Sequence, residues 1–126
     1  MIRPLACLLT AAPLMALLPA VAVAQSAPRG QILFLQCRSC HSLDAKGPSK
    51  VGPDLKKLFT RPALGAAGFK YSAAFTAEEP VWTAASLDRW LTRPSGMIKG
   101  TSMAFGGVAK PEDRATLIAW LKTTTK

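Results

Sequence analysis

The residues with the clearest chemical potential form one short run, Cys37-Arg38-Ser39-Cys40-His41. Positions three and four apart on a helix share a face, so both thiols and the imidazole can point at one ligand. In a C-x-x-C-H run, the two cysteines form thioethers with a haem and the adjacent histidine lies under the iron. The run therefore predicts a covalent site for one c-type haem, attached through Cys37 and Cys40, with His41 as proximal ligand.

Three other interpretations of this run are a zinc half-site, a thioredoxin-like redox pair and a chance match. A structural zinc site needs four Cys or His ligands, and beyond the run the chain offers only Cys7, in a segment that we expect to be removed. A redox C-x-x-C pair is expected within a βαβ pattern, which the sequence lacks. For this composition, chance gives about 0.0005 expected matches to the motif. Haem attachment is the favoured interpretation.

Residues 1–24 have the pattern of a secretory signal peptide, with a single charge at Arg3, an apolar run from Leu5 to Val23 and small residues at the end. We expect export to the periplasm, with residues 25–126 left as one small domain. An uncleaved membrane anchor is the weaker alternative, because two prolines interrupt the apolar run, which is also marginal in length for a membrane span.

The chain is strongly basic. It has 16 Lys and Arg against 7 Asp and Glu, a net charge of +9, and loss of Arg3 with the signal leaves +8. Nucleic acid is a common partner of so basic a chain, but an exported protein rarely meets it, and no basic stripe with interleaved aromatics is present. We therefore expect no nucleic-acid partner, and protein partners with acidic docking surfaces instead.

Helix signals occur in three places. The predicted helices run from Ser26 to the haem motif, from Thr83 to Pro94 and from Pro111 to Lys122. Each begins with a capping Ser or Thr, a proline in its first turn, or both. Residues 42–71 are rich in Gly, Pro, Lys and Ser without strand-like alternation, which predicts an ordered loop around the cofactor. The expected fold is all-α, with three to five helices and long loops wrapped around one covalent haem.

The second axial ligand of a low-spin haem is a methionine thioether or nothing, because His41 is the only histidine. Beyond the predicted signal the methionines are Met97 and Met103, and methionines more often fill core gaps than bind metals. Met103 lies among glycines and small polar residues that can form a loop bringing its sulfur over the haem. That context favours Met103 as the second axial ligand.

With these residues in place, the chain resembles a class I c-type cytochrome, the group that includes mitochondrial cytochrome c and bacterial cytochromes c2. The matching segments are Cys37-x-x-Cys40-His41, Val51 to Leu55, Gly68 to Tyr71, Trp82, Leu87 to Pro94, Gly100 to Phe105 and Leu117 to Leu121. The resemblance covers nearly all of residues 25–126. It implies the cytochrome c fold and a protein that transfers electrons rather than an enzyme.

The resemblance also implies roles for single residues. The Pro53 carbonyl would accept the free ring N–H of His41, Thr101 would help to seat the Met103 loop, and the terminal helices would cross near Gly30. The other residues that it places around the haem are Arg61, Tyr71, Trp82, Trp90 and Phe105, of which Tyr71 and Trp82 would hydrogen-bond a propionate.

Four positions depart from the family pattern. Lys99 replaces a common proline, Phe75 replaces an asparagine, and Trp90 and Trp120 replace tyrosines. Fewer polar groups would then surround Met103. The departures bear on the reduction potential and on loop rigidity, and not on ligation.

The resemblance favours a monomeric periplasmic one-electron carrier with His41 and Met103 as axial ligands. Its partners would be an oxidase, a cytochrome bc complex, a reaction centre or a dehydrogenase, and it would meet membranes only through them. One alternative is a haem subunit dedicated to one periplasmic oxidoreductase. Another is a peroxidase-like or gas-binding haem protein, which would require Met103 to be easily displaced.

The lysine ring that surrounds the haem edge of related carriers is thinned in this chain. Ser95, Gly96, Ser102, Ala109 and Gln36 occupy positions of that ring, while Lys50, Lys99 and Lys110 remain near it, with Arg93 beside them. We therefore expect a partner contact centred on Met97, Ala104 and Phe105, with only a shallow salt dependence.

Overall fold

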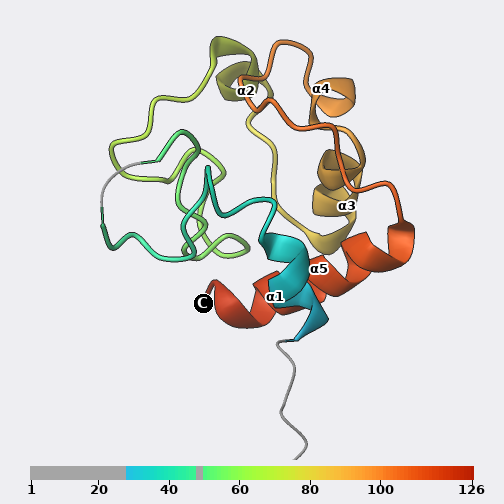
Figure 1. Cartoon of the computed structure of the whole chain (residues 1–126). Helices are drawn as coiled ribbons and strands as arrows, with labels where there is room; N and C mark the ends of the chain where they lie inside the picture. Colours follow the sequence, from blue (N-terminus) through green and yellow to red (C-terminus); the bar gives the residue numbers. More distant parts are fainter. Residues whose placement is uncertain (1–27, 48–49) are drawn as a thin grey trace, which may run out of the picture.

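The computed structural model of this chain describes residues 28–47 and 50–126. Within these ranges the regular secondary structure is entirely helical, which confirms the predicted all-α class. The helices are α1 (Arg29–Phe34), α2 (Ala73–Glu78), α3 (Ala84–Thr92), α4 (Pro94–Met97) and α5 (Pro111–Thr124), as Figure 1 shows. None of the helices in the described ranges is long and apolar enough to cross a membrane.

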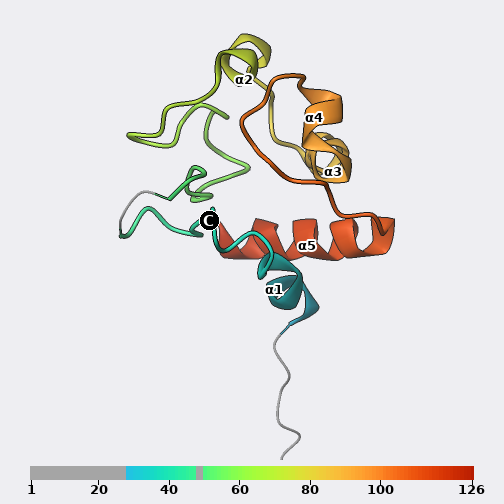
Figure 2. The ribbon, with the colours of Figure 1, turned by 45° about the horizontal axis from the view of Figure 1, so that its top comes forward.

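The first and last helices pack across each other beneath the rest of the domain (Figure 2). Gly30 allows this contact, since a Cβ there would lie 2.2 Å from the Cβ and 2.6 Å from the Cγ of Trp120. The Phe34 and Trp120 rings then meet with their centroids 5.4 Å apart. The crossing lies where the resemblance places it, and it brings the two ends of the domain together.

The predicted helix boundaries agree with the structure where it describes them. Thr83 and Ser86 form a reciprocal capping box at the start of α3, and α5 begins at Pro111. The predicted cap at Ser26 lies outside the described residues. Helix α2, which was not individually expected, begins where the Ser72 hydroxyl accepts a hydrogen bond from the Phe75 backbone N–H at 3.2 Å. Helix α4, a single turn that follows α3, was not individually expected either.

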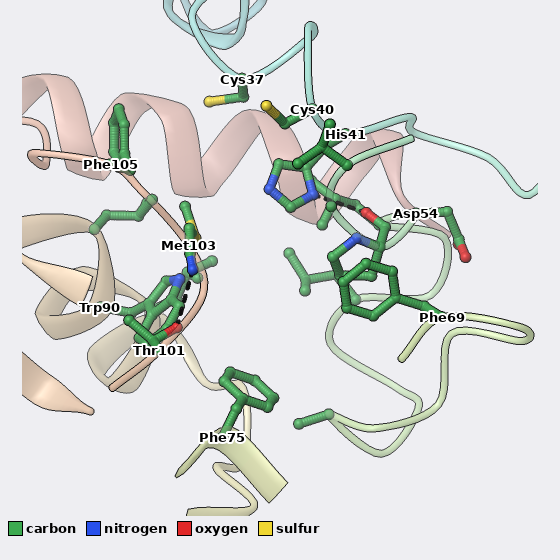
Figure 3. Close-up of a pocket in the computed structure, with 18 of the residues that line it drawn as sticks. Cys37, Cys40, His41, Asp54, Phe69, Phe75, Trp90, Thr101, Met103 and Phe105 are labelled. Atoms are coloured by element: carbon green, nitrogen blue, oxygen red, sulfur yellow. Dashed lines mark hydrogen bonds between the residues drawn. The ribbon is translucent and has the colours of Figure 1, made fainter. Parts of the chain in front are cut away.

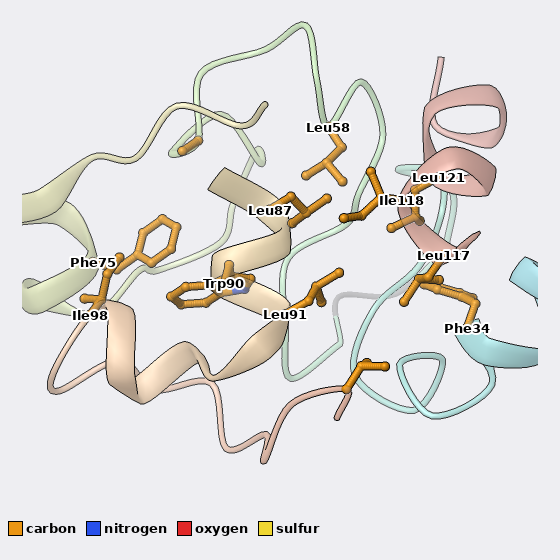
Figure 4. Close-up of a cluster of buried hydrophobic side chains, with 12 residues drawn as sticks. Phe34, Leu58, Phe75, Leu87, Trp90, Leu91, Ile98, Leu117, Ile118 and Leu121 are labelled. Carbon is orange, nitrogen blue, oxygen red and sulfur yellow. The ribbon is translucent and has the colours of Figure 1, made fainter. Parts of the chain in front are cut away.

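The core joins α1, α3 and α5 (Figure 4). Its fully or nearly buried members include Phe34, Leu58, Leu87, Trp90, Leu91, Leu117, Ile118 and Leu121. Residues 42–47 and 50–71 contain no helix, as predicted for the long loop, which lies to one side of the helices in Figure 1. This arrangement leaves a space between the loop and the helical layer.

The buried Arg114 side chain holds the segment that leads into α5. The Arg114 guanidinium donates to the Asp88 carboxylate at 2.7 Å and to the carbonyls of Val108 and Ala109 at 2.9 and 3.1 Å. Charge-assisted bonds of this kind are stronger than neutral ones. Arg114 therefore ties α5, α3 and the end of the Met103 loop together.

The helix crossing gives a first prediction. Gly30→Ala should lower the free energy of unfolding of the haem-loaded protein by about 2–3 kcal/mol, because the added methyl overpacks a rigid contact. Denaturant titration measures this loss. Gly106→Ala is the matched control, since a Cβ there meets nothing within 4 Å, and equal destabilisation of both variants would contradict the explanation.

Candidate functional site

A cavity of about 320 Å³ lies between the long loop and the helices. Its walls are largely apolar side chains from α3, α5 and the loops (Figure 3). All eleven residues expected around the haem line this cavity: Cys37, Cys40, His41, Pro53, Arg61, Tyr71, Trp82, Trp90, Thr101, Met103 and Phe105. Residues from four separate parts of the sequence thus meet around one space.

The haem-attachment motif forms a hydrogen-bonded turn after α1 rather than part of an α-helix. The backbone N–H groups of Cys40 and His41 both donate to the Cys37 carbonyl, at 3.1 and 2.9 Å. This helix-like turn brings both thiols and the imidazole to the same cavity wall, as the spacing predicted. The shared face was therefore predicted correctly, although α1 itself ends at Phe34.

The Cys37 thiol has the wrong electrostatics for a redox pair. Burial, and secondly the nearby Cys40, raise the pKa of the Cys37 thiol from 9.0 to about 11. Redox-active C-x-x-C pairs depend instead on a lowered thiol pKa. Cys37 is thus a protonated thiol at neutral pH, which disfavours the thioredoxin-like alternative.

His41 is held as a neutral imidazole. Burial lowers its pKa, the bond to Pro53 acts in the opposite direction, and the charge of Lys50 lowers it further. Its Nδ1 lies 2.7 Å from the Pro53 carbonyl oxygen, which can only accept, so the proton is on Nδ1. The lone pair of Nε2 is then free for a metal, as in most metal-binding histidines.

Residues 50–55, which we name the strap, lie against the haem-attachment turn. The backbone N–H of Gly52 donates to the Cys40 carbonyl at 2.8 Å, and that of Leu55 donates to the Ser42 carbonyl at 2.8 Å. A Cβ on Gly52 would lie 2.5 Å from Cε1 and 2.9 Å from Nδ1 of His41. Glycine is therefore required for the strap to approach the imidazole.

Met103 lies across the cavity from His41 (Figure 3). Its backbone N–H donates to the Thr101 hydroxyl at 3.3 Å, which agrees with the seating role implied for Thr101. Met97 does not line the cavity; it lies in α4 and packs against the core. The structure thus separates the two candidate methionines.

Two polar side chains of the cavity, Arg61 and Tyr71, already have partners within the protein. Arg61 donates to the Asp54 carboxylate at 2.9 Å and also to the Asp54 carbonyl, and both side chains are mostly buried. The Tyr71 hydroxyl accepts from the Ala66 backbone N–H at 3.1 Å, which leaves its own proton available. Sequence reasoning missed Asp54 and Ala66, and only the charge of Asp54, seven residues before Arg61, gave a signal.

One wall of the cavity is formed by four aromatic side chains, Tyr71, Phe75, Trp82 and Trp90. Tyr71 and Phe75 stack with ring centroids 5.4 Å apart, and Phe75, Trp82 and Trp90 meet one another at 5.6 to 6.2 Å. Phe75, singled out as a departure from the family pattern, lies at the centre of this cluster. The wall is consequently more apolar than an asparagine at this position would make it.

These features fit a covalent haem. Two thiols and a neutral imidazole with a free nitrogen lie on one side, a thioether lies on the other, and flat apolar and aromatic walls lie between them. A soft sulfur and an imidazole are ligands that haem iron accepts. No other part of the described chain offers such a combination of groups.

Comparison with known families matches residues 27–125 to the family described as Cytochrome c. The chain is 41% identical over 95 residues to a cytochrome c of Ulva intestinalis and 40% identical over 107 residues to one of Guizotia abyssinica, covering 86% and 96% of those proteins. It is also 40% identical over 106 residues to a cytochrome c homolog of Rickettsia conorii, of which it spans 61%. The chain belongs to the cytochrome c family.

Membership of this family gives the cofactor. One haem c is attached covalently through cysteines, and Cys37 and Cys40 are the residues present for it. Proteins of the family transfer electrons and are not enzymes, which disfavours the peroxidase-like alternative.

The close contact at Gly52 gives a second prediction. Gly52→Ala should displace the His41 ring, reduce the low-spin fraction of the haem spectrum and destabilise the protein by about 2–3 kcal/mol. Absorption spectra and denaturant titration measure the two effects. Val51→Ala is the neighbouring control, because Val51 is 82% exposed, and a normal Gly52→Ala spectrum would show that the strap can move away.

Proposed function

We propose that this chain is a periplasmic one-electron carrier in which His41 and Met103 are the axial ligands of the haem iron. The observation that supports the proposal best is the position of Met103, which faces His41 across the cavity while Met97 packs elsewhere. When bound, the haem supplies an iron that cycles between ferric and ferrous states. Two axial ligands leave no open coordination position, which suits electron transfer.

The remaining residues of the cavity would hold and orient the cofactor. The protons of the Tyr71 hydroxyl and the Trp82 indole are donors suited to a propionate, and Arg61 with Asp54 lies at the same cavity. Trp90 and Phe105 would pack against the ring, while Thr101 holds the backbone of Met103. Apolar packing of this kind excludes water from the iron.

The ligand assignment gives a third prediction. Ferric wild-type protein should show a methionine-to-iron charge-transfer band that is lost in Met103→Ala and kept in Met97→Ala. Met103→Ala should also bind external imidazole about tenfold more tightly or better, because the open position no longer has a competing ligand. Loss of the band in Met97→Ala alone would show that Met97, and not Met103, is the ligand.

The proposed location depends on residues 1–24, which lie outside the described residues. The supporting features are the apolar run and its terminal small residues, which match an export signal. An exported carrier would meet redox partners in the same compartment, and the monomeric state and choice of partner are part of this proposal.

The proposed docking surface is the mouth of the cavity. Its exposed lining residues are Gln36, Ser39, Val51, Ser102 and Ala104, and Phe105 beside them is partly exposed. All of these are uncharged, and the charged lining residues Asp54 and Arg61 pair with each other. Contact there would be mainly apolar, with steering left to more distant cations.

The uncharged mouth gives a fourth prediction. Raising the ionic strength until exposed charges are screened should slow electron exchange with ferricyanide, a small anion, by less than about threefold. Exchange with a cationic cobalt phenanthroline complex should accelerate by a similarly small factor. Lys99→Gln and Lys110→Gln should alter these slopes more than the control Lys122→Gln. A dependence of the exchange rates on ionic strength as steep as the full charge of +8 predicts would contradict an uncharged mouth.

A further inference from the structure

Lys50 begins the strap and reaches back to the haem-attachment turn. Its Nζ lies 2.5 Å from the Arg38 carbonyl oxygen and 3.3 Å from the His41 carbonyl oxygen. Both bonds join residues nine to twelve positions apart in the chain. The side chain thus connects the strap to the residue expected to bind the iron.

These two carbonyls need a donor for a simple reason. The last carbonyls of a helical turn have no partner within the turn. The strap supplies donors to their neighbours through the backbone N–H groups of Gly52 and Leu55, which bond Cys40 and Ser42. For Arg38 and His41 the donor is an ammonium group, so the bond brings a full positive charge with it.

That charge is not cancelled nearby. Among the described residues, the ion pairs are Arg29 with Asp113, Arg61 with Asp54 and Arg114 with Asp88, and none includes Lys50. Asp54, the acid within the strap, is already paired with Arg61. The ammonium also bonds the backbone of His41 itself, with Nζ 3.3 Å from the His41 carbonyl oxygen.

We infer that Lys50 is a positioning residue that clamps the haem-attachment turn and, through its charge, favours the reduced iron. A cation near the metal destabilises the more positive ferric state relative to the ferrous state. This inference rests on the proposed ligation by His41. Lys50 is an exposed member of the docking lysines expected from the sequence, and its ammonium already bonds two backbone carbonyls.

The test is an equilibrium redox titration of purified haem-loaded protein against soluble mediators of fixed potential, in which protein docking plays no part. In Lys50→Met, the equilibrium constant for reduction should fall about threefold to tenfold, the size expected for loss of one partly solvated charge. Its denaturation midpoint should also fall, because two carbonyls lose their donor. Lys50→Arg should restore most of the equilibrium constant.

Lys46→Met is the matched control, because Lys46 is an exposed lysine of the same loop whose ammonium makes no hydrogen bond or ion pair among the described residues. It should change the constant by less than about twofold, as expected for a screened surface charge. An equal fall in both variants, or no fall in Lys50→Met, would overturn the inference. If Lys50→Met does not mature, Lys50→Gln provides the same comparison with an uncharged donor.

Failure of the inference can be told apart from failure of the proposed ligation. If His41 and Met103 are not the ligands, the wild-type protein itself will lack a low-spin spectrum with the methionine band. If only the Lys50 inference fails, the wild-type and Lys50→Met proteins will both show that spectrum, and Lys50→Met will change the equilibrium constant no more than Lys46→Met does.

Discussion

The hydrogen bond between the His41 ring and the Pro53 carbonyl is the contact on which the rest of the site depends. It selects the tautomer that leaves Nε2 free, and its 2.7 Å length requires the strap to run directly over the ring. Only a residue without a side chain can precede Pro53 in that position, which accounts for Gly52. The strap in turn can be held there because the chain is anchored before the haem motif and again just after the strap.

The helices supply those anchors. Crossing of α1 and α5 at Gly30 fixes the residues just before the haem motif, and the backbone N–H of Lys57 donates to the Thr125 carbonyl at 2.6 Å, which fixes the loop just after the strap. Lys57 adopts a left-handed conformation, φ 56°, to make this contact. The segment that follows α5 therefore supports the strap against His41 as well as the core.

Local sequence signals were sufficient for the all-α class and for the meeting of Cys37, Cys40 and His41 at one cavity. Cys37, Cys40 and His41 follow from spacing, and the starts of α3 and α5 follow from Thr83 and Pro111. The bonds of Lys50 and Arg61 could not be predicted, because they depend on how the loop folds back on itself. Lys50 was placed near the docking face from the lysine ring of related carriers, which gives no sign that its ammonium bonds the carbonyls of Arg38 and His41.

Two glycines with positive φ bracket the Met103 loop, Gly100 at 85° and Gly107 at 100°. Beyond Gly107, Val108 and Ala109 are fastened by Arg114, whereas residues 101–106 contribute only the half-buried Met103, Thr101 and Phe105 side chains to the interior. Such a segment, with flexible joints at both ends and few buried contacts, has the character of a small independent opening unit. Opening of residues 101–106 would uncover the Met103 side of the cavity while every helix stays folded, so the access of water to that side is set by the stability of six residues and not by that of the whole domain.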